Sequence, residues 1–376
     1  MALLHDAIHN PRKLFLRRAA FQIHLWSGVL ISLYMIVIAI TGAVLVFEDE
    51  LTSTTLPPHL SSYNPATTVS IPSVMQQFQH AYPGAHVVAI DTPWRTVPAY
   101  SLRAAYGSGE EFNLIADPVT AALHPQPKTW VNWVHDLHVY LLLNSSYGAQ
   151  VNGVGAAILL VLSITGIILW WQGLKNWTRA LKIDFRRNWR RFNFDAHHAI
   201  GIWTFAIVVW WSISGVYFGW FRQFTATVNS ISPLKGMAPP PLPAHVSTGP
   251  RRASLEAIIA SAQAASPHGR LFGLSDPSLT GNLVYAQMDV GRPADFSHRD
   301  IVAIDTTNAR TLTVWHYGQN HSAGDWFMWA QHPLHFGTVW GFGVKILWFL
   351  LGISLAVLTA TGLLMYWNRY LRHKLG

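Results

Sequence analysis

The sequence predicts an α-helical integral membrane protein, a bundle of four transmembrane helices built by parallel internal duplication, with two small α+β lobes outside the membrane. Three observations predict this fold class. Of the 376 residues, 51% are hydrophobic and only 12% are charged, a composition too apolar for an ordinary soluble protein. Four long stretches contain no Asp, Glu, Lys or Arg, and the pattern of histidine and glycine around them occurs twice.

The four uncharged stretches are residues 19–47, 137–174, 196–221 and 346–368. About 20 helical residues cross a hydrocarbon core of ~30 Å, so each stretch predicts one membrane span. The second stretch is too long for one span, and NSSYG at 144–148 is expected to break it. We therefore expect a short helix that carries His135 and His138, followed by a span near residues 152–171.

Lysine and arginine predict the orientation of the spans. Three short segments hold more than half of the 26 basic residues, and the positive-inside bias places them in the cytoplasm. These residues are Arg12, Lys13, Arg17 and Arg18 before the first span, Lys175, Arg179, Lys182, Arg186, Arg187, Arg190 and Arg191 in the connector, and Arg369, Arg372 and Lys374 in the tail. We expect a multi-pass protein of the bacterial inner membrane with both termini inside and large periplasmic loops.

The formal charge of +8 is explained by basic residues that fix orientation and meet anionic lipid headgroups, so nucleic-acid binding is not needed to account for it. Cysteine is absent. That absence excludes disulfides, iron–sulfur clusters, thiolate metal sites and the covalent attachment of c-type haem.

The two long loops share one plan. In the first, a helix over residues 73–84 precedes strand-like HVVAI, AYSLRAAY and EFNLIADPVTAAL; in the second, a helix over 253–265 precedes NLVYAQMDV and DIVAIDTTNARTLTVW. Each loop is expected to form a small α+β lobe. The expected segments are 1–47 (N-terminal segment and first span), 48–129 (first lobe), 130–174 (short helix and second span), 175–195 (basic connector), 196–221 (third span), 222–325 (Pro-rich linker and second lobe), 326–368 (short helix and fourth span) and 369–376 (tail).

The spans repeat as well. His24 is followed by Gly28 and by Thr41-Gly42, and His197 is followed at the same spacings by Gly201 and by Ser214-Gly215. The pair His135 and His138 recurs 197 residues later as His332 and His335. Because the first and third spans are both expected to start inside, this repeat predicts a parallel duplication about an axis along the membrane normal.

Topology sorts these histidines into two groups. An inner pair, His24 and His197, is expected near the cytoplasmic face, and an outer group near the periplasmic face. The outer group contains His135, His138, His332 and His335. A single imidazole in a span often serves only to join helices by a hydrogen bond. Matched pairs from two related halves are instead typical of two axial ligands of one planar metal cofactor.

Two bis-histidine b-type haems explain this pattern better than the alternatives. The sequence lacks the local H-E-x-x-H motif of a zinc hydrolase and has no acid within the spans. A copper site would favour Cys or Met near histidine. We expect His24 and His197 to bind one haem iron and His138 with His335 to bind a second, because these two lie one turn closer to the membrane. His135 and His332 are expected as hydrogen-bond donors to the ligands, propionate contacts or groups near the substrate, and a third haem between them stays open. His198 is expected as a packing or propionate contact.

Several motifs together resemble one known family. They are HLWSGVLISLYMIVIAITG and DAHHAIGIW in the odd spans, LHVYLLL and PLHFGTVWG before the even spans, SITGIILWW and TATGLLMYWNR at their ends, and ADPVTAALHP and AIDTTNARTLTV in the lobes. With these motifs the chain resembles the PepSY-associated transmembrane proteins, and within them the FoxB-type inner-membrane siderophore reductases. The two lobes are then PepSY-like.

This resemblance implies a di-haem reductase that delivers electrons to a periplasmic ferric siderophore and releases Fe(II). The family's H…G motif falls on His24 with Gly28 and on His197 with Gly201, and its LH motif falls on His138 and His335. Two other functions stay open: an electron-transfer subunit for another periplasmic enzyme, and a non-redox anchored binding or regulatory protein. A nicotinamide site is disfavoured because no G-x-G-x-x-G follows a strand, so the expected electron donor is a quinol or a cytosolic reductase.

Overall fold

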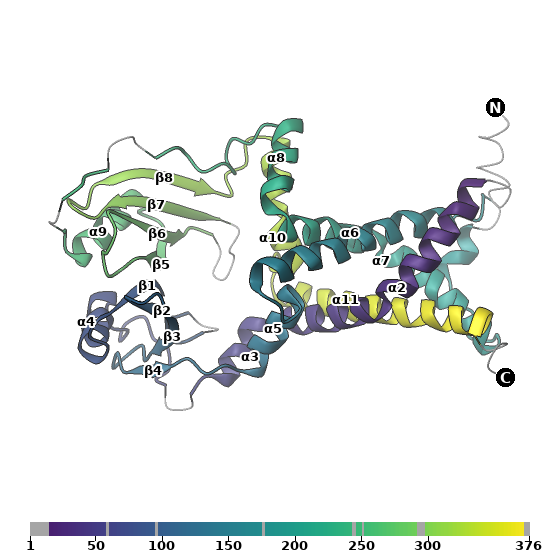
Figure 1. The fold of residues 1–376 in the computed structure, drawn as a ribbon, viewed down its shortest axis with the longest axis horizontal. Helices are drawn as coiled ribbons and strands as arrows, with labels where there is room; N and C mark the ends of the chain where they lie inside the picture. Colours follow the sequence, from purple (N-terminus) through teal and green to yellow (C-terminus); the bar gives the residue numbers. More distant parts are fainter. Residues whose placement is uncertain are drawn as a thin grey trace. The chain divides into compact units, whose positions relative to one another are not determined.

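The structure is a computed structural model (Figure 1), which describes residues 15–57, 60–94, 97–174, 177–242, 246–249, 252–291 and 298–371. The basic residues Arg12, Lys13, Lys175, Arg372 and Lys374 lie outside the described residues, and so does most of the tail. The chain divides into two compact units. The helical unit contains Met1–Phe47, Asn132–Thr227 and Leu334–Gly376, and the sheet unit contains Glu48–Val131 and Val228–Pro333.

The helical unit confirms four helices long and apolar enough to cross a membrane. They are α2 (Phe15–Leu45), α6 (Ser145–Trp170), α7 (Trp189–Gly219) and α11 (Phe342–Tyr366), which continues as a short π-helix to Leu371. Both α2 and α7 pack against α6 and α11. Apolar side chains fill the centre of the bundle, among them Met35, Val208 and Leu355, and their burial favours the bundle.

Two short helices carry the outer histidines. Helix α5 (Trp130–Tyr140) contains His135 and His138, and α10 (Ala323–Phe336) contains His332 and His335. The break after α5 comes earlier than expected, at Leu141 and Leu142, whose φ angles are 54° and 58°. Most of NSSYG therefore belongs to α6. A glycine is needed at position 148, because a side chain there would meet the Tyr140 backbone.

The sheet unit contains four strands from each long loop in one shared sheet, so the division into two lobes stays a prediction. Its strands form one antiparallel sheet in the order β4-β3-β2-β1-β5-β6-β7-β8. The strands are β1 (Ala85–Asp91), β2 (Tyr100–Tyr106), β3 (Glu111–Ala116), β4 (Leu123–Pro125), β5 (Arg270–Ser275), β6 (Leu283–Asp289), β7 (Arg299–Asp305) and β8 (Thr311–Tyr317).

The two halves of the sheet meet where β1 pairs with β5. The paired residues are Ala89 with Ser275, Ile90 with Leu274 and Asp91 with Gly273. Without this pairing each first strand would present an open edge of unpaired backbone groups, which attracts other chains. The pairing converts two edges into the middle of one sheet.

Helices α4 (Ile71–Ala81) and α9 (Leu255–Ala265) pack against the sheet and form one hydrophobic core with it. Ser70 and Ser254 cap them, each accepting a backbone N–H of the first turn through its hydroxyl. Phe78 and Ile258 from these helices are fully buried against strand residues such as Leu102 and Val302. The structure also describes two helices outside the bundle core, α3 (Glu48–Thr55) and α8 (Phe221–Ile231).

One buried carboxylate fixes the start of α10. Asp325 is 0% exposed, and its oxygens accept hydrogen bonds of 2.9–3.0 Å from five backbone N–H groups. The donors are Lys235, Gly236, Met237, His321 and Ser322. Burial opposes ionisation, but these N–H groups prevail and hold the pKa of Asp325 well below its usual range. The carboxylate thereby joins the segment after α8 to the first turn of α10.

Candidate functional site

Four histidines of the helical unit each contact the hydroxyl of a Ser-Gly or Thr-Gly dipeptide on a neighbouring helix. The Nδ1 atom of His24 lies 3.0 Å from Thr165 Oγ1, and that of His197 lies 3.1 Å from Thr361 Oγ1. The histidines of the short helices α5 and α10 make the same contact: His138 Nδ1 lies 3.0 Å from Thr41 Oγ1, and His335 Nδ1 lies 2.6 Å from Ser214 Oγ. These are the four residues predicted as iron ligands.

These contacts determine which ring nitrogen carries the proton. Each of the four hydroxyls donates its own proton to a backbone carbonyl of its helix; Thr165, for example, donates to Val161 O at 2.7 Å. The hydroxyl oxygen then accepts from Nδ1–H of the imidazole. In His24 and His197 the same Nδ1 also lies 3.1 Å from a carbonyl, which can only accept. The lone pair of each ring is therefore on Nε2, as a metal ligand requires.

The imidazole rings of the inner pair lie close together and nearly perpendicular to each other. The ring centroids of His24 and His197 are 6.3 Å apart, and the ring planes make an angle of 86°. A metal–imidazole bond is about 2 Å, so two rings on opposite sides of one ion have centroids roughly 6 Å apart. The spacing of the inner pair fits axial ligation of a single iron.

A cavity of about 940 Å³ surrounds this pair, within the range of cofactor sites. Leu25, Leu162 and Phe205 give it apolar walls, while Gly28 and Gly201 leave room beside the rings. Gly166 and Gly362 lie under the imidazoles, because an added Cβ would come within 3.3 Å of His24 or His197. The dimensions, the apolar lining and the two Nε2 lone pairs together fit a haem.

The outer pair is built in the same way. Burial lowers the pKa of His138 to about 4, so its imidazole is neutral at neutral pH. His335 packs against Phe218, with ring centroids 5.1 Å apart. His138 is held by α2 and His335 by α7, and their facing across a second haem stays a prediction.

Gly42 offers a test of the outer site. A Cβ at this position would lie 2.8 Å from His138 Cε1, whereas a Cβ at Gly343, in the first turn of α11, would have no atom within 4 Å. We expect Gly42→Ala to displace the His138 ring and to weaken one haem in the absorption spectrum of the purified protein. Gly343→Ala is the control, because Gly343 does not line the cavity of the inner pair, and it should leave the spectrum unchanged. Equal spectra for both variants would contradict a ligand role for His138.

The remaining candidate histidines have different surroundings. His198 packs against Phe194 with ring centroids 4.2 Å apart and ring planes tilted by 35°, and its Nδ1 is buried with no hydrogen-bond partner among the described residues. His135 is partly exposed and its Nδ1 lies 3.6 Å from Asp136 Oδ1. Burial lowers the pKa of His332. Of the three, only His198 lines the cavity of the inner pair.

The family model for the PepSY-associated TM region matches residues 21–369. The chain belongs to the PepSY-associated TM family. No curated protein matches the chain. The family match includes most of each membrane helix and the whole sheet unit.

Within the described part of this PepSY-associated TM protein, no group of three or more His, Asp and Glu side chains could hold a metal ion. Two imidazoles are the number that an axially ligated haem needs. The hydroxyl partners Thr165 and Thr361 are functional candidates that the histidine pattern alone does not reveal. Their signal in the sequence is the recurrence of the dipeptide Thr-Gly near the ends of both even spans.

Proposed function

We propose that this PepSY-associated TM protein is a di-haem b reductase of the bacterial inner membrane, which reduces periplasmic ferric siderophore and releases Fe(II). One observation carries the proposal: four imidazoles in two related halves each donate Nδ1–H to a hydroxyl, which leaves the lone pair of each ring on Nε2. A purely structural histidine needs no such uniform tautomer. The 6.3 Å spacing of the inner pair supports a ligand role.

His24 and His197 would hold one haem, and His138 and His335 the other. When bound, the two groups supply one-electron transfer across the bilayer. The protein's own side chains orient the imidazoles, increase their basicity through hydrogen bonds to Nδ1–H and exclude water with the apolar helix faces. The finer topology belongs to this proposal. The equivalent histidine partners in the two halves support parallel duplication, and the basic residues that flank the spans support cytoplasmic termini.

The chemistry requires no acid or base. Ferric iron is a hard ion held by hard siderophore oxygens, and ferrous iron prefers softer donors. One electron reduces Fe(III) to Fe(II). The siderophore binds Fe(II) more weakly and releases the ion. The electron comes from a quinol in the lipid bilayer or from a cytosolic reductase.

The test is spectroscopic. The full-length protein, purified in detergent from cells supplied with haem, is measured oxidised and dithionite-reduced, and haem per chain is quantified. Excess dithionite is removed and a ferric hydroxamate siderophore is added to the reduced form, with an Fe(II) chelator present to detect release. We expect two b-type haems per chain that reoxidise as Fe(II) appears.

Other outcomes favour the alternatives. Two haems that are not reoxidised by any ferric chelate would indicate an electron-transfer subunit for a separate enzyme. A protein without a Soret band would instead be an anchored binding or regulatory protein, and the four histidines would serve to join helices.

A further inference from the structure

The cavity of the inner pair has an unbalanced charge. Arg17, Arg18, Arg190 and Arg369 line it, and no Asp or Glu is among its described lining residues. All four arginines lie at the end of the bundle where α2 and α7 begin and α11 ends. Cations that line a cavity attract an anionic group.

Two of these arginines already have partners in the protein. Arg17 donates to the carbonyl oxygens of Ile168, Leu169 and Trp171 at 2.6–2.8 Å and so caps the C-terminus of α6. The guanidinium of Arg369 lies 5.0 Å from the centre of the Phe21 ring. Arg18 and Arg190 have no hydrogen-bond or ion-pair partner among the described residues.

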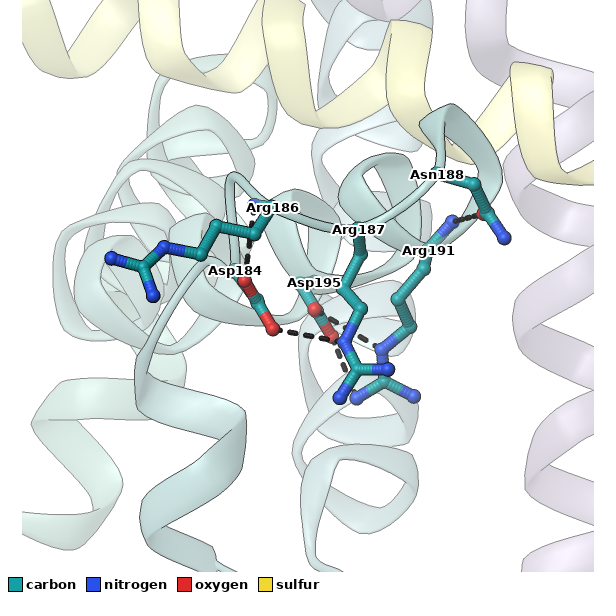
Figure 2. Close-up of polar contacts among 6 residues, drawn as sticks. All are labelled: Asp184, Arg186, Arg187, Asn188, Arg191 and Asp195. Atoms are coloured by element: carbon teal, nitrogen blue, oxygen red, sulfur yellow. Dashed lines mark hydrogen bonds and ion pairs between the residues drawn. The ribbon is translucent and has the colours of Figure 1, made fainter.

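The nearby carboxylates already form ion pairs with other arginines (Figure 2). Asp195 binds Arg191 at 2.9 Å, and Asp184 binds Arg187 at 3.0 Å. Arg190 lies in the first turn of α7, after the cap residue Asn188, where the helix dipole disfavours a cation. A bound anion would offset this unfavourable interaction.

Helix geometry relates Arg190 to the iron site. Arg190 precedes His197 by seven residues, which is close to two turns, so both project from the same face of α7 about 10 Å apart along the axis. Haem carries two propionate carboxylates at one edge, and these are the only charged groups at its periphery. The buried Nδ1 of His198, which lines the same cavity, supplies a further polar group there.

We propose that Arg18 and Arg190 bind the two propionate groups of the haem held by His24 and His197, and so orient that haem with its propionates toward the beginnings of α2 and α7. This inference rests on the proposed function. Each half of the protein supplies one iron ligand and one arginine. Arg18 and Arg190 are positioning residues and do not touch the iron.

The test compares Arg190→Gln with Arg190→Lys and with the control Arg186→Gln. Arg186 lies on the same basic connector but does not line the cavity. The full-length variants are loaded either with haem or with haem dimethyl ester, whose propionates carry no charge. Haem release to an excess of a haem-scavenging protein is then measured by absorption, and size-exclusion chromatography checks folding.

With haem, Arg190→Gln should release one of the two haems about tenfold faster than the unchanged protein, as expected for loss of a charge-assisted hydrogen bond. Arg190→Lys should restore most of the retention, and Arg186→Gln should behave like the unchanged protein. With the dimethyl ester, Arg190→Gln should have no effect.

Equal release from Arg190→Gln and the unchanged protein would overturn the inference while the proposed function stands. The same acceleration with the ester would also overturn it, because the effect would not act through the propionates. A protein that binds no haem at all would refute the proposed function and this site with it.

Discussion

Replacing His197 with alanine is expected to remove one of the two haems, so that the haem content of the purified protein falls from about two to about one per chain. In the proposed site the imidazole of His197 would supply one iron ligand through Nε2, and the small side chain of alanine would supply none. His24→Ala should cause the same loss, because His24 is the opposite ligand of the same site. The measurement is the pyridine haemochrome assay together with the reduced spectrum.

His198→Ala is the matched control, since His198 is adjacent in sequence and lines the same cavity but packs against Phe194. This variant should keep both haems. Retention of two haems in His24→Ala or His197→Ala would refute the inner pair as ligands. Loss of a haem in His198→Ala alone would transfer the ligand role to that residue.

Asp325→Ala is expected to destabilise the sheet unit by at least about 3 kcal/mol, because it leaves five backbone N–H groups without their acceptor and each unsatisfied donor costs roughly 1–3 kcal/mol. Denaturant unfolding followed by the circular dichroism of the strands measures the loss. The exposed Glu110, in the turn between β2 and β3, gives the control Glu110→Ala, which should be within ~0.5 kcal/mol of the unchanged protein.

The pH dependence of this difference has a definite sign. The pKa of Asp325 is lowered in the folded protein, so its stabilisation is complete above the unfolded pKa of about 3.9 and is lost as the pH falls toward the folded pKa. The gap between Asp325→Ala and the unchanged protein should be constant from about pH 5 to 8 and should shrink below about pH 4. A gap that grows on acidification would contradict the assignment.

Composition and periodicity were sufficient to predict the membrane helices, because a span of ~30 Å must be apolar throughout and leaves a long uncharged stretch. The repeated spacing of His24 and His197 likewise predicted a pair, and the structure brings these two rings to 6.3 Å. The equivalence of Thr41-Gly42 and Ser214-Gly215 was visible in the sequence. Their contacts with His138 and His335 were not, since they join different helices.

Other features depend on tertiary contacts that no local pattern contains. The short strand β5 was missed, and with it the pairing of β1 with β5, because RLFGLS does not alternate apolar and polar residues. The different roles of Arg17 and Arg190 follow from their partners, although each precedes its histidine by seven residues. In the helical unit, Arg17 reaches the end of α6, whereas no described residue pairs with Arg190.

The three residue pairs between β1 and β5 make the two halves of the sheet dependent on each other. If the chain were cut in the connector after α6, each fragment would carry an exposed strand edge and one histidine of each proposed ligand pair. Reassociation of the fragments would then have to restore a backbone ladder and a ligand pair together. Covalent fusion of the halves removes this bimolecular step, and it makes the sheet unit one cooperative folding unit.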